Sequence, residues 1–195
     1  MNLNSQSCLI EAHQITTHNV LAHADLNVPI DLKRAVRVLN NAEYDPEKFQ
    51  SVRVRFFREN ALISVFSTGK IQATGVRTAQ DARLCMKRVA FRLKKYGEYP
   101  ELRFSNFRVE NALATVDVDY LINLQGLSCD RSVVCMYEPS RFAAAVIRDL
   151  DDTKATIDVF ASGKINVKAP GGVDIMLRAL NKAMPVISKY RVGDY

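Results

Sequence analysis

The hexapeptide Phe66-Ser-Thr-Gly-Lys-Ile71 occurs a second time, 94 residues later, as Phe160-Ala-Ser-Gly-Lys-Ile165. Two further motif pairs occur in the same order, at offsets of 92 and 93 residues: Asn19-Val-Leu-Ala-His-Ala-Asp-Leu26 with Asn111-Ala-Leu-Ala-Thr-Val-Asp-Val118, and Tyr44-Asp-Pro-Glu-Lys-Phe49 with Tyr137-Glu-Pro-Ser-Arg-Phe142. Three motifs in one order, with an offset that drifts by only two residues, indicate an internal duplication. We therefore expect an N-terminal arm at residues 1–18, a first repeat at 19–110 and a second repeat at 111–195.

Both repeats have the same predicted order of strands and helices, judged from apolar spacing. In the first repeat we expect strands at 19–26, 51–57, 61–67 and 71–74, and helices at 31–40, capped by Asp31, and at 79–96. In the second repeat we expect strands at 111–120, 144–149, 155–161 and 165–168, and helices at 126–136 and 173–187. The predicted fold class is α+β, with two pseudo-symmetric repeats that form a curved antiparallel sheet, helices on one face and the other face bare.

The positive charge of the chain is concentrated in the first repeat. The net charge is +6, with 17 Lys/Arg against 10 Asp/Glu in residues 19–110 but 10 against 10 in residues 111–195. This distribution is compatible with a polyanion or an acidic protein as partner, and a solvated basic face has the same composition.

Several functional classes find no support in the sequence. The chain has no run of eighteen apolar residues and no basic-then-apolar start, so we expect no membrane association and no export. The four cysteines fit neither a zinc site nor a disulfide framework, and His13, His18 and His23 are spaced by five residues, which suits no metal site on a helix face. No glycine-rich phosphate loop occurs. We therefore predict no enzyme activity, no cofactor, no metal and no small-molecule substrate.

The repeated motifs resemble the conserved core of the TATA-box-binding protein family. The tract from Phe66 to Gly75 resembles its strand-and-turn signature, and residues 41–49 and 137–139 resemble the approaches to its two stirrup loops. The resemblance extends from about Asn19 to Tyr190. It implies a saddle-shaped protein whose concave sheet binds the minor groove of A·T-rich double-stranded DNA, with helices on the convex face. Such proteins insert apolar side chains between base steps, and this family is a standard example of that mode.

The resemblance assigns a DNA-binding role to residues of both repeats. The intercalating side chains correspond to Phe49, Phe66, Phe142 and Phe160. The base contacts correspond to Asn19, Asn111, Leu21, Leu113 and Thr74, and the phosphate contacts to Lys48, Arg55, Lys70, Arg148 and Lys164. Amide donors suit A·T pairs, which offer only acceptors in the minor groove.

Other positions differ from the family pattern. Ser64 and Asp158 occupy positions where the resemblance implies leucine, Gln72 and Asn166 replace valines, and Lys168 replaces a threonine. A carboxylate that faces DNA meets phosphates and loses water on binding, and both effects are unfavourable. Lys168 offsets Asp158 in part, either as an internal pair or by contacting a phosphate. We therefore predict a divergent, TATA-binding-protein-related factor with relaxed or altered sequence preference.

The resemblance also implies protein partners and a nuclear transcription initiation factor. The basic face that corresponds to the surface for general transcription factor IIA carries Arg83, Lys87, Arg88, Lys94 and Lys95. The second stirrup keeps Glu138, which corresponds to the contact for factor IIB, but Ser140 and Arg141 replace an acidic and an apolar residue. An alternative is a scaffold recruited by protein contacts, or one that binds an acidic protein that mimics DNA, without direct TATA binding.

Overall fold

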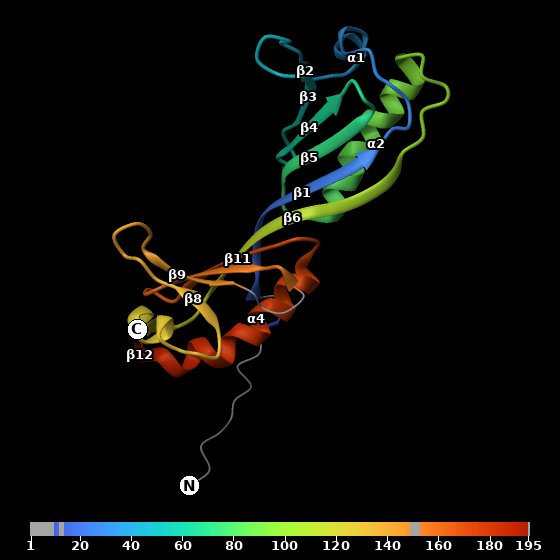
Figure 1. The fold of residues 1–195 in the computed structure, drawn as a ribbon. Helices are drawn as coiled ribbons and strands as arrows, with labels where there is room; N and C mark the ends of the chain where they lie inside the picture. Colours follow the sequence, from blue (N-terminus) through green and yellow to red (C-terminus); the bar gives the residue numbers. More distant parts are fainter. Residues whose placement is uncertain (1–9, 12–13, 149–152, 195) are drawn as a thin grey trace. The chain divides into compact units, whose positions relative to one another are not determined.

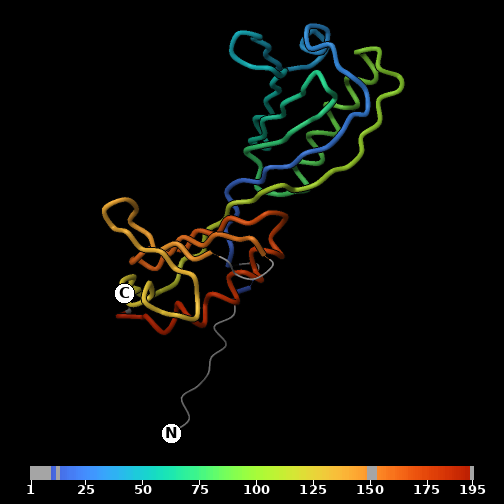
Figure 2. The backbone as a smooth tube through the Cα atoms, in the orientation of Figure 1, coloured from blue at the N-terminus to red at the C-terminus, as the bar shows by residue number. Residues whose placement is uncertain are grey.

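The computed structural model describes residues 10–11, 14–148 and 153–194 of the 195-residue chain. These residues form two compact units. The N-terminal unit comprises His18–Asn111, and the C-terminal unit comprises the described residues from Ala112 onward together with those before His18. In Figure 1 and Figure 2 the N-terminal unit runs from blue to yellow-green, and the C-terminal unit continues from yellow-green to red.

The N-terminal unit contains one sheet and two helices. Its elements are β1 (Thr16–Asp25), α1 (Leu32–Val38), β2 (Ala42–Glu43), β3 (Ser51–Phe56), β4 (Ala61–Phe66), β5 (Lys70–Val76), α2 (Ala79–Tyr96) and the first part of β6 (Ser105–Asp117). The strand order is β2-β3-β4-β5-β1-β6. The pairs from β2 through β5 to β1 are antiparallel. Helix α2 packs on β4 and β5 (Figure 1).

Both helices of this unit begin at capped residues. The Asp31 carboxylate accepts hydrogen bonds from the backbone N–H groups of Lys33 and Arg34, at 2.9 and 3.2 Å. The Thr78 hydroxyl accepts one from the N–H of Asp81 at 3.0 Å. Such caps satisfy N–H groups that have no partner within the helix. The predicted cap at Asp31 and the predicted bounds of the helix at 79–96 are therefore confirmed.

The C-terminal unit repeats this plan. Its elements are the last part of β6, β7 (Tyr120–Ile122), α3 (Leu124–Ser128), β8 (Val134–Met136), β9 (Ala144–Arg148), β10 (Thr156–Phe160), β11 (Lys164–Ala169), α4 (Val173–Ile187), the 3-10 helix η3 (Ser188–Tyr190) and β12 (Arg191–Asp194). The larger sheet has the order β6-β11-β10-β9-β8, and β12 pairs with β7. Helix α4 packs on β11.

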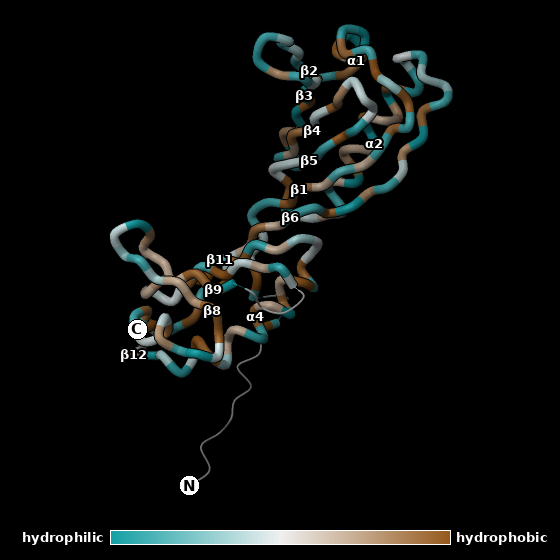
Figure 3. Tube along the Cα trace, in the orientation of Figure 1, coloured by the Kyte–Doolittle hydropathy of each residue, from teal (hydrophilic) through white to brown (hydrophobic). Residues whose placement is uncertain are grey.

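The core of each unit lies between the sheet and the long helix. Every second residue of β4, namely Ala61, Ile63 and Val65, is buried, as are Ile157 and Val159 of β10. This period of two is expected for a strand with one face on the core. Figure 3 shows the contrast with the loop after β2, residues 44–50, which is largely hydrophilic.

One predicted element was wrong. The helix expected at 126–136 is only the short α3, and the chain then forms β8 against β9. Asp130 accounts for the change, because its carboxylate accepts from the Ser132 N–H at 2.8 Å and from the Tyr190 hydroxyl at 2.9 Å. The turn that Asp130 holds ends the helix. Strand β6 also begins at Ser105, six residues before the predicted start at residue 111, and the predicted strand end at residue 149 lies outside the described residues.

Candidate nucleic-acid interface

Each sheet has a second face, which points away from the long helix and which we call the open face. In the N-terminal unit its strand residues include Asn19, Leu21, His23, Arg53, Arg55, Leu62, Ser64, Phe66, Lys70, Gln72 and Thr74. In the C-terminal unit they are Leu113, Thr115, Val146, Arg148, Thr156, Asp158, Phe160, Lys164, Asn166 and Lys168. Most of the DNA-binding residues that the sequence predicts in strands therefore lie on the open faces.

Phe66 of the N-terminal unit lies beside a turn whose conformation favours glycine. Phe66 ends β4, and the chain turns at Gly69, whose φ is +84°. A side chain at Gly69 would clash with the carbonyl oxygen of Val28, which explains why the motif keeps glycine here. Phe49 is 38% exposed, and the guanidinium carbon of Arg53 lies 4.2 Å from its ring centroid. Sequence reasoning missed Arg53, although strand parity with Arg55 could have placed it on this face.

The corresponding phenylalanines of the C-terminal unit contact each other. The ring centroids of Phe142 and Phe160 are 5.9 Å apart, and the rings meet edge to face at 72°. Aromatic pairs favour this geometry. Phe142 remains 45% exposed, and Phe160 is half-buried at the end of β10. The structure thus brings together the two side chains that the sequence predicts as one wedge pair.

Asn19 has one end of its amide fixed by the backbone. Its Oδ1 accepts a hydrogen bond from the Gly75 N–H at 2.8 Å. This bond leaves the NH₂ group as the end of the side chain that can donate to an acceptor outside the protein. Thr74 is half-buried opposite Leu62, Leu21 and Leu113 are half-buried, and Asn111 is exposed.

The predicted phosphate-binding side chains are exposed at the edges and turns of the open faces: Lys48, Arg55, Lys70, Arg148 and Lys164. Lys48 is paired with Asp45 at 3.0 Å. Lys70 borders a hollow of about 420 Å³ that Gln50, Phe66 and Arg108 also line. In the same hollow the His23 Nε2 atom contacts the Glu110 carboxylate. Gln50, Arg108 and the His23–Glu110 pair were not predicted, because their grouping depends on strand register and loop position.

Asp158 lies on the predicted face but is not presented to solvent. Its neighbours Ile157 and Val159 are buried on the core side, as parity requires, yet Asp158 is itself only 3% exposed. The ammonium of Lys168 lies 2.8 Å from its Oδ2, so the internal pair is the arrangement that the chain adopts. Beside them, the Thr115 hydroxyl donates to Asn166 Oδ1 at 3.0 Å.

The basic face predicted on α2 is only partly free. Arg88 is paired with Glu59 at 2.6 Å, and Lys94 donates to the Leu102 carbonyl at 3.2 Å. Arg83 lies over the Phe107 ring, with 5.7 Å between the guanidinium carbon and the centroid. Lys87 is exposed, and Lys95 lies near the rings of Phe91 and Tyr96.

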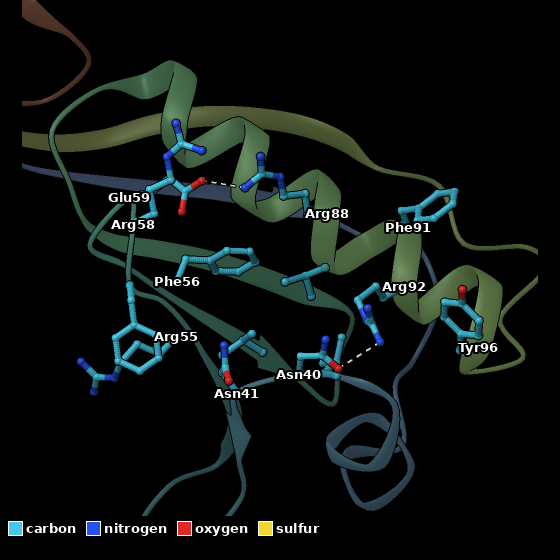
Figure 4. Close-up of a pocket in the computed structure, with 14 residues that line it drawn as sticks. Asn40, Asn41, Arg55, Phe56, Arg58, Glu59, Arg88, Phe91, Arg92 and Tyr96 are labelled. Carbon is cyan, nitrogen blue, oxygen red and sulfur yellow. Dashed lines mark hydrogen bonds and ion pairs between the residues drawn. The ribbon is translucent and has the colours of Figure 1, made fainter.

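Beside α2 lies a hollow of about 480 Å³, lined by residues of α2, of β3 and of the chain before β2. Figure 4 shows Arg88 and Arg92 extending from the helix on one side and Asn40 and Asn41 on the other, with Arg92 bonded to Asn40. Phe57, which also lines the hollow, is 75% exposed. The hollow beside α2 is therefore lined by apolar side chains at its centre and by basic side chains at its rim.

In the predicted second stirrup, the backbone carbonyl of Glu138 accepts hydrogen bonds from the N–H groups of Arg141 and Phe142, at 2.9 and 3.0 Å. This turn carries Phe142 at its end. The Glu138 side chain is exposed, and its carboxylate lies 3.4 Å from Arg141.

Comparison with known proteins identifies the family. The family model described as Transcription factor TFIID (or TATA-binding protein, TBP) matches residues 14–96 and 106–190. TATA-box-binding protein 2 of Entamoeba histolytica is 31% identical over 176 residues, which cover 90% of this chain and 82% of that protein. The chain belongs to the TATA-binding protein family.

Two further TATA-binding proteins are similar to this one. The TATA-box-binding protein of Saccharomyces cerevisiae is 28% identical over 176 residues, which cover 90% of this chain and 72% of that protein. The solved structure of Methanococcus jannaschii TBP matches with a TM-score of 0.77 at 28% identity, over 90% of this chain and 99% of that one. The predicted family and fold class are therefore confirmed.

Membership in the TATA-binding protein family confirms that the chain is not an enzyme, because the family consists of DNA-binding transcription factors. Within the described residues, no helix is long and apolar enough to cross a membrane, and no three His, Cys, Asp or Glu side chains gather as metal ligands. His13 and Cys8, which the sequence analysis considered, lie outside those residues.

Proposed function

We propose that this TATA-binding-protein family member binds double-stranded DNA from the minor groove and bends it, and thereby nucleates transcription initiation complexes in the nucleus. The observation that carries the proposal is the retention, in both repeats, of a pair of phenylalanines beside an open sheet face. Phe142 and Phe160 contact each other in the second repeat, and Phe49 and Phe66 are the corresponding residues of the first. Large rigid rings at such positions are the side chains that unstack base steps in minor-groove binding.

The polar groups on the open faces support the same function. The free NH₂ end of Asn19 suits the purine N3 and pyrimidine O2 acceptors of the minor groove. Exposed cations such as Arg55, Lys70 and Lys164 suit phosphates, and such contacts position a protein without selecting a sequence. Ser64, Gln72, Asn166 and the Asp158–Lys168 pair make the open faces more polar than the family pattern, which favours a relaxed sequence preference.

The proposed protein partners bind outside the open faces. Lys87, the rim of the hollow beside α2 and the exposed Phe57 offer basic and apolar groups to an acidic factor such as factor IIA. Factor IIB is a candidate at the Glu138 loop, where Arg141 alters the charge that the family pattern carries.

The test is binding and bending of a labelled A·T-rich duplex, with a random duplex alongside, at several salt concentrations. We expect binding whose affinity falls steeply with salt, because the cations release counterions from the phosphates, and a bend on the A·T-rich duplex. Absence of duplex binding at low salt would refute this function. Binding of an acidic DNA-mimicking protein instead would favour the scaffold alternative, which the polar residues Ser64 and Gln72 on the open face of the N-terminal unit support.

A further inference from the structure

The open face of the C-terminal unit carries a carboxylate and an ammonium side by side. Asp158 is the middle residue of a row that runs across three strands, from Asn166 on β11 through Asp158 on β10 to Val146 on β9. Lys168 lies two residues beyond Asn166 on the same face and reaches Asp158 diagonally, with its Nζ 2.8 Å from Oδ2. The Lys168 side chain is 48% exposed, whereas that of Asp158 is 5% exposed.

This pair has hydrogen-bonding capacity left over. A carboxylate accepts at both oxygens, and the bond from Lys168 uses Oδ2. An ammonium has three donors, so two remain after the bond to Asp158. The pair therefore offers one acceptor next to two donors. Because the Lys168 side chain is 48% exposed and that of Asp158 only 5%, a ligand on the open face meets the ammonium first, and a contact to Oδ1 requires the side chains around it to rearrange.

A G·C base pair presents the complementary pattern in the minor groove. The guanine N2 amino group is a donor, and it lies between the acceptors guanine N3 and cytosine O2, whereas A·T pairs present acceptors only. An apolar sheet face rejects G·C because it buries the amino group without a partner, which is costly. A carboxylate at the same position gives that amino group an acceptor.

We infer that the Asp158–Lys168 pair makes the C-terminal unit tolerate a G·C pair, with Asp158 Oδ1 accepting from the guanine N2 amino group and Lys168 donating to the neighbouring acceptors. This inference rests on the proposed minor-groove binding and adds the residues that determine base preference. The N-terminal unit has Ser64 and Thr74 at the corresponding positions, without a charged pair. The two halves of a DNA site therefore differ in whether they tolerate a G·C base pair.

The experiment compares G·C with inosine·C, because inosine lacks only the N2 amino group and otherwise presents the minor-groove edge of guanine. One base pair of an all-A·T duplex is replaced by either pair, in turn at each position of each half-site, and affinities are measured by fluorescence anisotropy. For the wild-type chain we expect a position in one half-site where G·C binds at least as tightly as inosine·C. For Asp158→Leu we expect G·C to bind about tenfold more weakly than inosine·C at that position, the loss typical of one unmatched base pair.

Two further variants make the result decisive. Asp158→Leu combined with Lys168→Thr removes both charges, and it must show the same discrimination even if the single replacement folds poorly with an unpaired lysine. Ser64→Leu is the matched control in the N-terminal unit, and it must leave the G·C-tolerant position unchanged. If the wild-type chain discriminates against G·C at every position as strongly as the double variant does, the inference is wrong while DNA binding stands. If the wild-type chain binds no duplex, the proposed function fails as well.

Discussion

Replacement of Phe142 and Phe160 by alanine tests the wedge mechanism most directly. The rings are half-buried or exposed and touch edge to face at 5.9 Å. Burying a phenylalanine fully contributes about 1.5–3 kcal/mol, and an aromatic pair adds about 0.5–1.5 kcal/mol. With each ring about half-buried, we expect the double replacement to lower the free energy of unfolding by about 2–4 kcal/mol.

The expected effect on DNA binding is separate from this loss of stability. Stacking of a base on an aromatic side chain contributes about 1–3 kcal/mol, so two rings contribute about 2–6 kcal/mol. The double variant should therefore bind an A·T-rich duplex at least about 30-fold more weakly. Because no charge changes, the slope of log affinity against log salt should stay the same. Energy transfer between fluorophores at the duplex ends measures the bend, and we expect the bend to be reduced.

Phe57→Ala is the matched control for the same assays. Phe57 is 75% exposed, follows β3 and lines the hollow beside α2, and it is not one of the phenylalanines that correspond to a wedge. Its replacement removes a ring of equal size, yet DNA affinity and bend should not change. The wedge mechanism is refuted if the Phe142/Phe160 variant folds, binds the duplex and still bends it as the wild-type chain does.

Three further predictions concern stability and reactivity. Gly163→Ala should lower the free energy of unfolding by more than about 1 kcal/mol in urea, because Gly163 has a φ of +87° and a side chain there would clash with backbone carbonyls. Hydrogen bonds, first from Ser132 and then from Tyr190, lower the pKa of the Asp130 carboxyl from 3.8 to about 2. The contribution of Asp130 to the stability of the folded chain is therefore present above about pH 4 and is lost as the pH falls towards 2. Asp130→Asn should flatten that part of the acid unfolding curve, and an unchanged curve would contradict this. Burial raises the pKa of the Cys85 thiol to about 11, so iodoacetamide at pH 8 should alkylate the exposed Cys129 and spare Cys85, as peptide mass spectrometry would show.

The local features of the fold could be predicted from the sequence because their causes are local. Asp31 caps α1, and the apolar spacing of residues 79–96 is that of the helix observed there. The repeated motifs keep glycine at Gly69 and Gly163 because both residues have a positive φ and a side chain at either would clash with a nearby backbone carbonyl. The alternation of side chains along a strand also placed Asp158 correctly on the open face of the sheet.

Features that depend on distant residues could not be predicted in this way. The end of α3 depends on a hydrogen bond between Asp130 and Tyr190, which are 60 residues apart. Parity placed Asp158 on the open face, but its burial depends on the reach of the Lys168 side chain from the neighbouring strand. The orientation of the Asn19 amide depends on the N–H of Gly75. In each case a side chain contacts an element whose position the local sequence does not determine.

The polar open faces are compatible with DNA binding for a reason that the sequence alone did not reveal. A minor-groove complex excludes water, and an isolated charge or amide would then lose its hydration without compensation. Here Asp158 is bonded to Lys168, Thr115 to Asn166, His23 to Glu110 and Asn19 to Gly75. Because these groups already have protein partners, their dehydration costs less than the dehydration of free groups. A face that is polar but internally bonded can therefore approach the base edges, so the proposed change in base preference does not require the loss of the proposed bending.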